Sequence, residues 1–384
     1  MNLFEYYSPG HALFGAGCVQ GICREIRRRG LKKALIVTDD KLRATDIVGK
    51  VTDILEKEGT EFCFFSRFKP NPTTGNVNQG AGEFMENSCD FLISIGGGSA
   101  HDCAKAISVV AANGGMIEDY RGIDRSRFIY PLIAVTTTAG TGSECTTKYV
   151  VVDEAKNEKY GNSDRNVMPV LAVDDYQLMM DMPTSLTAGT GMDALTHAVE
   201  AYVSIHSTLI TSELAAAAVR LIFCHLEHAV CSPDMESREG MAVAQFLAGI
   251  AFGNAGCGLV HSMSHQLSAL YDLPHGLCNA ILMPAASRLN SKDLRAQKRY
   301  AMLCRAVFPV ESDGMEEKEQ AEYLITRIEA LSRAAGTKRP LMELGVKAED
   351  IPVLADKTLL DGSLSHNIYQ PDKAELEEVF RELL

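Results

Sequence analysis

At residues 91–99 the chain reads Phe91-Leu92-Ile93-Ser94-Ile95-Gly96-Gly97-Gly98-Ser99, a strand pattern that runs directly into three glycines. The first five residues form a short, mostly apolar run, which is typical of a strand buried on both faces of a parallel sheet. A helical pattern follows from about His101 to Val110. Glycines between a strand and a helix let the backbone and the helix N-terminus approach a pyrophosphate. The simpler alternative is an ordinary tight turn.

Similar strand and helix patterns alternate on both sides of this stretch. The expected strands are residues 34–38, 62–65, 91–95 and 132–135, and the expected helices are residues 45–59, 74–88 and 101–110. This order predicts a parallel sheet with helices on both faces, as in a Rossmann-like domain. The G-x-G-x-x-G fingerprint of many dinucleotide sites is absent, because Gly15-Ala16-Gly17 lacks the required context.

The sequence changes character after Pro183. Long segments rich in Ala and Leu replace the β-rich runs, and their apolar residues recur at helical spacing. These segments are residues 189–204, 207–231, 237–252 and 260–271. We therefore predict an α/β domain over residues 1–183 and an all-α domain over residues 184–384.

Polar residues follow two more of the expected strands. Thr136 to Glu144 is a dense run of hydroxyls and small residues, suited to line a nucleotide, although a plain polar loop would look similar. Asp39 follows the strand 34–38, where an acid accepts hydrogen bonds from ribose hydroxyls and repels a 2′-phosphate. Asp39 could equally cap a helix. Asp102, near the start of its helix, favours the helix dipole and could also bond a ligand.

Four residues of the second half suit a metal ion. Asp193 and His197 are four apart on an expected helix and so share one face. His261 begins a second helical motif that ends at His265, and His275 lies at a turn or helix start. One carboxylate and three imidazoles favour Fe or Zn over Ca or Mg. The simpler reading is that these are ordinary core or surface histidines.

The composition limits the class of protein. A net charge of −13 argues against nucleic acid or an anionic membrane as partner. The eleven cysteines include no C-x-x-C pair, which argues against a disulfide framework and a thiolate zinc site. We see no signal peptide and no run of 18 apolar residues. These features predict a cytoplasmic protein.

Taken together, the motifs resemble the iron-containing (group III) alcohol dehydrogenases, a family with the dehydroquinate synthase-like fold. Within that family, the chain looks most like the 1,3-propanediol, lactaldehyde and methanol dehydrogenase branch. The similarity covers nearly the whole chain. Its main motifs are Pro70 to Thr73, Gly96 to Asp102, Thr137 to Glu144, Lys159 with Asp164 to Asn166, Gly191 to Glu200, His261 to His265, and Pro274 to Asn279.

The resemblance implies roles for individual residues. Asp193, His197, His261 and His275 would bind one divalent metal, usually Fe²⁺ and alternatively Zn²⁺. His265 would lie near the nicotinamide and substrate as the catalytic histidine, and Phe252 would line a small pocket. The residues implied for NAD(H) are Asp39, Asn71, Gly96, Gly97, Gly98, Ser99, Asp102, Thr137, Thr138, Thr141, Ser143, Lys159 and Leu178.

The chain also departs from the family pattern. The usual Asn-Pro-Arg near the C-terminus is replaced by His366-Asn367-Ile368-Tyr369-Gln370-Pro371. Cys257 stands where a Leu is common, and Lys148 is a further difference. Tyr369, Cys257 and Lys148 are therefore candidates for the substrate pocket, but they do not identify the substrate.

The function expected is reversible hydride transfer between NAD(H) and a short alcohol or aldehyde. The candidate pairs and aldehydes are 1,3-propanediol with 3-hydroxypropanal, lactaldehyde, simple primary alcohols and sulfoacetaldehyde. The alternative is a catalytically silent metal- and nucleotide-binding or assembly protein of the same fold. Residues Leu3 to Tyr7 alternate as an exposed strand would, which suggests a homodimer through this edge.

Overall fold

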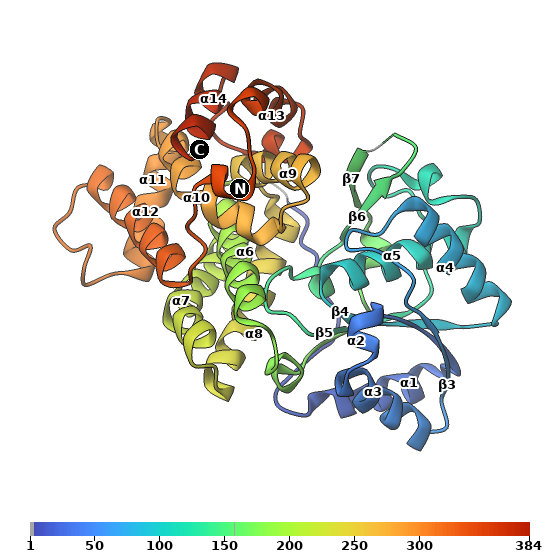
Figure 1. Ribbon diagram of the computed structural model, residues 1–384. Helices are drawn as coiled ribbons and strands as arrows, with labels where there is room; N and C mark the ends of the chain where they lie inside the picture. The colour runs from blue at the N-terminus through green and yellow to red at the C-terminus, as the bar shows by residue number, and fades with distance from the viewer. Residues whose placement is uncertain (1–3, 157) are drawn as a thin grey trace. The chain divides into compact units, whose positions relative to one another are not determined.

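The computed structural model describes residues 4–156 and 158–384. The chain divides into two compact units: one is Tyr7–Asp181, and the other is Met182–Leu384 together with residues 4–6. The first contains a parallel sheet with helices, and the second is built of helices (Figure 1). The expected fold class, an α/β part followed by an all-α part, is confirmed.

The α/β unit is organised by a six-stranded sheet with the order β1-β8-β5-β4-β2-β3. Every neighbouring pair in this sheet is parallel. The strands are β1 (Ala12–Phe14), β2 (Lys33–Val37), β3 (Glu61–Phe65), β4 (Phe91–Gly96), β5 (Leu132–Thr136) and β8 (Leu171–Asp174). The four strands expected from the sequence are β2, β3, β4 and β5. The edge strand β1 and its neighbour β8 were not anticipated; β1 has only three residues, too few to show a clear pattern.

Helices cover both faces of this sheet (Figure 1). The helices α1 (Ile22–Arg29) and α3 (Asp46–Lys57) bury apolar side chains in one core, and α4 (Thr74–Glu86) and α5 (Gly98–Asn113) do so in another. The helix α5 begins three residues before the expected start at His101, because Gly98 and Ser99 already belong to its first turn. The short helix α2 (Asp40–Arg43) and an antiparallel pair, β6 (Lys148–Asp153) and β7 (Glu158–Ser163), complete the unit.

The strand order places the expected cofactor loops at one edge. From β2 the chain crosses to β3 on one side of it, and then returns to β4 on the other side. The carboxyl ends of β2 and β4 therefore flank a topological switch point, the place where open parallel sheets bind ligands. Asp39 follows β2, and Gly97 follows β4.

The helical unit is arranged around α6 (Thr184–Val203), which is buried on nearly all sides after its first two turns. It packs against α7 (Leu209–Cys231), α8 (Met235–Ala255) and α10 (His275–Asn290). The remaining helices are α9 (Leu259–Tyr271), α11 (Leu294–Val307), α12 (Glu317–Ala334), α13 (Ile351–Leu359) and α14 (Lys373–Glu382). Polar residues on α6 are consequently held in an apolar, water-poor interior.

One helix in the described part of the chain, α7, is long and apolar enough to cross a membrane by length and composition alone. Its most apolar window is 44% buried within the fold, and the helix packs along α6 and α8. Core helices of helical bundles commonly have this composition. The successive helices α8 and α9 pass the same test only together, and they are bent by 101°.

The expected strand at residues 3–7 is wrong for the part that the structure describes. Residues 4–9 have no strand conformation, and pairing begins at Ala12, which lies opposite Ala172 of β8. Pro9 and Gly10 explain the delay, since both residues disfavour a regular strand. Leu3 lies outside the described residues.

Candidate metal centre and cofactor site

Three helices bring the expected metal ligands together. Asp193 and His197 lie on one face of α6, His261 lies in the first turn of α9, and His275 begins α10. Asp193 Oδ1 is 3.9 Å from His261 Nε2 and 3.7 Å from His275 Nε2. His197 Nδ1 is 4.0 Å from Asp193 Oδ2. The expected ligands thus converge from three segments spread over residues 193–275 of the sequence.

The glycine next to His275 is required by the close packing of α10 on α6. A Cβ atom added to Gly276 would lie 2.3 Å from the carbonyl oxygen of Gly189 and 3.3 Å from Cβ of Asp193. Any side chain at Gly276 would therefore push α10 away from α6. The Pro274-His275-Gly276 motif holds the imidazole of His275 close to the carboxylate on α6.

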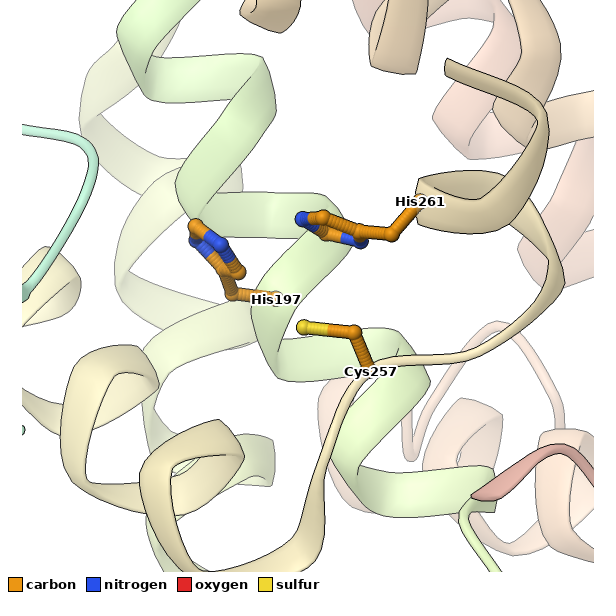
Figure 2. A group of neighbouring side chains, drawn as sticks. All are labelled: His197, Cys257 and His261. Atoms are coloured by element: carbon orange, nitrogen blue, oxygen red, sulfur yellow. The ribbon is translucent and has the colours of Figure 1, made fainter. Parts of the chain in front are cut away.

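A cysteine joins the other side of this cluster. One ring nitrogen each of His197 and His261 and the sulfur of Cys257 lie within 4.8 Å of one another. Figure 2 shows these side chains converging from α6, from the start of α9 and from the loop before it. The rings of His197 and His261 stack at 4.7 Å, and Phe252 stacks on the other side of His197 at 4.0 Å. Phe252 thus fixes the plane of the His197 imidazole.

Hydrogen bonds select which nitrogen of each histidine faces the cluster. His261 Nδ1 lies 2.5 Å from Glu200 Oε2, and His275 Nδ1 lies 3.1 Å from the hydroxyl of Ser264. Metal-binding histidines usually have such a partner on the other nitrogen. Since both Nε2 atoms turn toward Asp193, the donors fit a divalent transition metal.

Glu200 is a fully buried carboxyl group in the middle of this arrangement. Besides facing His261, it accepts hydrogen bonds from the backbone N–H groups of Gly258 at 2.9 Å and Val260 at 2.6 Å. Burial raises the pKa of Glu200 to about 7, although the two backbone donors oppose this shift. The carboxyl group therefore ties the end of α6 to the first turn of α9.

Asn279 contacts three of the expected ligands at once. Its Nδ2 lies 2.7 Å from Asp193 Oδ1, 3.3 Å from His261 Nε2 and 3.2 Å from His275 Nε2. Its Oδ1 is buried and has no hydrogen-bond partner among the described residues. Because Asn279 is four residues after His275 on α10, both side chains point to the same side of that helix.

His265 lies one turn after His261 and has its own carboxylate partner. Its Nδ1 lies 2.9 Å from Asp361 Oδ2, and its ring stacks on His275 with centroids 5.3 Å apart. Burial acts to raise the pKa of Asp361, but the hydrogen bond and charge of His265 outweigh it and keep that pKa below its usual value. An ionised Asp361 would hold the proton on Nδ1 and leave Nε2 as the proton acceptor.

The two expected cofactor loops of the α/β unit pack directly on one another. A Cβ atom on Gly97 would lie 2.9 Å from the hydroxyl of Thr138, and one on Gly98 would lie 3.0 Å from Cγ2 of Thr141. Gly96 has φ 151°, which favours glycine, and its carbonyl accepts a hydrogen bond from the backbone of Thr137 at 3.0 Å. The three glycines are thus needed for the close packing of the two loops.

A buried lysine holds the loop between β5 and β6, residues 137–147, by hydrogen bonds to its backbone. Lys105 on α5 donates to the backbone carbonyls of Ser143, Thr146 and Lys148 at 2.6, 2.9 and 2.7 Å. Burial lowers the pKa of Lys105 to about 8, partly opposed by the charge of Asp102. Asp102 in turn accepts a hydrogen bond from the Ser143 hydroxyl at 2.8 Å, which links α5 to this loop.

A third group links the remaining cofactor candidates. The backbone N–H of Asn71 donates to the Ser99 hydroxyl at 3.2 Å, and Lys159 donates to Asn71 Oδ1 at 2.9 Å. Asn71 has a positive φ of 59°, a conformation that Asn tolerates better than most residues.

Asp39 caps α2, since its Oδ1 accepts from the backbone N–H groups of Lys41 and Leu42 at 3.0 and 2.9 Å.

The structure also shows the surroundings of three further expected site residues. Leu178 is 2% exposed and belongs to the core between the sheet and α1 and α3. Lys148 begins β6 in the α/β unit, where its carbonyl accepts from Lys105. The hydroxyl of Tyr369 donates to Glu375 at 2.6 Å, at the start of α14. None of these contacts involves the expected metal ligands.

Sequence reasoning gave no role to several residues that contact the candidate site residues: Glu200, Asn279, Ser264, Asp361 and Lys105. Two of them carried a usable signal. Glu200 is seven residues after Asp193 on the same helix face, and Asn279 is four residues after His275. Asp361 is 96 residues from His265 in the sequence, and no local pattern reveals that pairing.

Comparison with known proteins identifies a family for both halves of the chain. A family profile described as iron-containing alcohol dehydrogenase matches residues 9–176. A second, described as the C-terminal part of the Fe-containing alcohol dehydrogenase family, matches residues 187–384.

Individual relatives cover almost the whole chain. Alcohol dehydrogenase 4 of Schizosaccharomyces pombe is 42% identical over 99% of this chain and 89% of its own length. The NAD-dependent methanol dehydrogenase of Bacillus methanolicus is 40% identical over 93% of both chains. A crystal structure of 1,3-propanediol oxidoreductase superimposes with a TM-score of 0.96 and 37% identity over 100% of both chains.

Proposed function

The chain belongs to the iron-containing alcohol dehydrogenase family, and from this premise we propose that it interconverts a short-chain alcohol and its aldehyde with NAD(H). The family and the relatives make it an oxidoreductase of this type. The finer assignment is our own: a short aliphatic or functionalised substrate, such as 3-hydroxypropanal, lactaldehyde, a simple primary alcohol or sulfoacetaldehyde. The observation that carries the proposed alcohol–aldehyde interconversion is the convergence of Asp193, His261 and His275 on one point.

We propose that Asp193, His197, His261 and His275 hold one divalent ion, which is Fe²⁺ or alternatively Zn²⁺ or another divalent metal. Such an ion acts as a Lewis acid toward a carbonyl or alkoxide oxygen. The protein supports this role by orienting His261 and His275 through Glu200 and Ser264, and by burying Asp193, His197 and His261. Phe252 packs against His197 and limits how far that ring can turn.

We assign the proton relay to His265. Asp361 holds its Nδ1, so Nε2 is available to accept a proton from an alcohol or to return one to the product. Because the His265 side chain is 28% exposed, it can exchange that proton with solvent. The alternative role, in which His265 only positions the substrate, predicts the same loss of rate without a change in pH dependence.

In the α/β unit we propose that the Gly96–Ser99 turn binds the pyrophosphate of NAD(H). The backbone N–H groups at the start of α5 supply the donors. Thr138 and Thr141, which pack on these glycines, would line the cofactor, and Lys159 and Asn71 would lie beside a ribose. Asp39, after β2, would favour NAD(H) over NADP(H).

Two wider expectations remain proposals. We propose a cytoplasmic location, which suits a chain whose described cysteines form no disulfide. We also propose a homodimer, since Phe4 and Tyr6 expose 44% and 38% of their surface near the N-terminus. A monomeric mass by light scattering would contradict the dimer.

The function is tested with anaerobically purified protein reconstituted with Fe²⁺. NADH oxidation is measured against the four classes of aldehyde named above, and His261→Ala serves as the ligand-deficient variant. One aldehyde strongly preferred by kcat/KM, with activity lost in His261→Ala, would support the proposal. Stoichiometric binding of metal and NADH without turnover on any aldehyde would instead favour a catalytically silent binding or assembly protein.

A further inference from the structure

A second group of metal-binding atoms overlaps the candidate metal centre. The first group is Asp193, His261 and His275, and the second is His197, Cys257 and His261. Within each group the ligand atoms lie within 4.8 Å of one another. His261 belongs to both groups, so the sulfur and imidazole donors of the second group adjoin the oxygen and imidazole donors of the first at this residue.

The loop that carries Cys257 is fixed on both sides. The backbone N–H of Gly258 donates to Glu200 at 2.9 Å. Gly256 has φ 82°, and a Cβ atom there would lie 2.6 Å from the ring of His366. Only 8% of Cys257 is exposed, and Figure 2 shows its sulfur turned toward the space between the rings of His197 and His261. The thiol is therefore held in the cluster by the backbone on either side of it.

We propose that Cys257 is a ligand that selects the metal. Together with the imidazoles of His197 and His261, its thiolate would be a soft sulfur donor that makes this centre favour Zn²⁺ and Co²⁺ over Fe²⁺. This inference rests on the proposed function, because it concerns the ion that the dehydrogenase would hold. Imidazole and carboxylate sets bind several divalent metals, whereas an added thiolate shifts preference toward thiophilic ions.

The chemistry of this step needs no oxidant. The thiol loses its proton to solvent as the sulfur binds the ion, and the ion remains divalent. The imidazoles of His197 and His261 bind as neutral groups through lone pairs. The predicted signature is thus one proton more released per ion in the wild type than in a variant without the thiol.

The direct test is the absorption spectrum of the full-length protein after its metal is exchanged for Co²⁺ under anaerobic conditions. A Cys257 thiolate on Co²⁺ gives a sulfur-to-metal charge-transfer band in the near ultraviolet, in proportion to bound Co²⁺. We expect the band in the wild type and in Cys304→Ala, a matched control that removes a buried thiol of α11 outside both groups. We expect it to be absent in Cys257→Ala and Cys257→Ser.

The second measurement is metal preference without turnover. Each protein is equilibrated with equal Zn²⁺ and Fe²⁺, and the bound metals are quantified by mass spectrometry. The Zn-to-Fe ratio should fall by about tenfold in Cys257→Ala and Cys257→Ser, the scale on which single site residues alter metal affinity. It should be unchanged in Cys304→Ala. If Cys257→Ala fails to fold by circular dichroism, the near-isosteric Cys257→Ser carries both measurements.

The outcomes separate this inference from the proposed function. Stoichiometric Co²⁺ binding without the band, or with a band that survives Cys257→Ser, would overturn the role of Cys257 and leave the dehydrogenase assignment intact. An unchanged Zn-to-Fe ratio would overturn the selectivity. Failure of the wild type and of Cys304→Ala to bind any divalent ion would overturn both proposals.

Discussion

Nδ1 of His261 lies 2.5 Å from Oε2 of Glu200, and at most 4% of either side chain is exposed. The contact joins α9 to α6 and leaves Nε2 of His261 directed to Asp193. Glu200 accepts a backbone N–H with each oxygen, Val260 at Oε1 and Gly258 at Oε2, so both oxygens must be acceptors.

Glu200→Gln should therefore weaken metal binding by about 10- to 100-fold. The glutamine amide replaces one acceptor with a donor, which then opposes a backbone N–H. Metal affinity is measured by competition with a chelator, and Glu227→Gln on the exposed side of α7 is the control. Equal affinities in wild type and Glu200→Gln would show that the carboxylate does not orient His261.

Asn279→Ala tests the second residue that touches several ligands. Its amide nitrogen donates to Asp193 Oδ1 at 2.7 Å, and this bond can persist when Nε2 of His261 and of His275 binds the ion. The loss of this bond should loosen the carboxylate and lower metal affinity about tenfold. Asn290→Ala is a matched control, since Asn290 is a buried asparagine of the same helix that bonds Asn367 and Tyr300. If both variants lose stability but only Asn279→Ala loses metal, the contact is specific to the site.

The sequence predicted the elements that have strong local periodicity. The buried strand 91–95 and the glycines after it were found because a parallel strand needs a continuous apolar run and its turn needs small residues. The helix pair Asp193 and His197 followed from a spacing of four. Short outer strands such as β1 carried too few residues to show a period.

The partners across helices could not be found in this way. Helical spacing tells which residues share a face, but the residue opposite that face depends on how distant segments pack. Asp361 reaches His265 only because the chain returns to α9 after α13. A buried carboxyl group such as Glu200 does demand a partner on physical grounds, yet the sequence does not say which one.

Lys105→Met should destabilise the α/β unit. The lysine donates to three backbone carbonyls that would be left without this donor, so we expect a loss of about 2–4 kcal/mol at pH 7. NADH affinity should fall as well, because the loop that carries Ser143 loses its support. Lys50→Met, on the exposed side of α3, is the control.

The same variant has a predictable pH dependence. Burial lowers the pKa of Lys105 from 10.5 to about 8. Between these values the unfolded chain binds more protons than the folded one, so the free energy of unfolding rises with pH. This gain, on the order of 3 kcal/mol at most, is absent in Lys105→Met. The gap between wild type and variant in urea unfolding should therefore widen from pH 8 to pH 10, and a constant gap would mean that the ammonium is not desolvated.

Asp39 has two separable roles, and a pair of variants distinguishes them. Asp39→Asn keeps a cap oxygen for Lys41 and Leu42 but removes the charge, whereas Asp39→Ala removes both. If the charge repels a 2′-phosphate, both variants should raise the NADP-to-NAD ratio of kcat/KM, by about tenfold for a repulsion of roughly 1.4 kcal/mol. Only Asp39→Ala should lose about 1 kcal/mol of stability in urea unfolding. An unchanged cofactor ratio in Asp39→Asn would restrict Asp39 to its role as the cap of α2, since that variant alters the charge and leaves the cap in place.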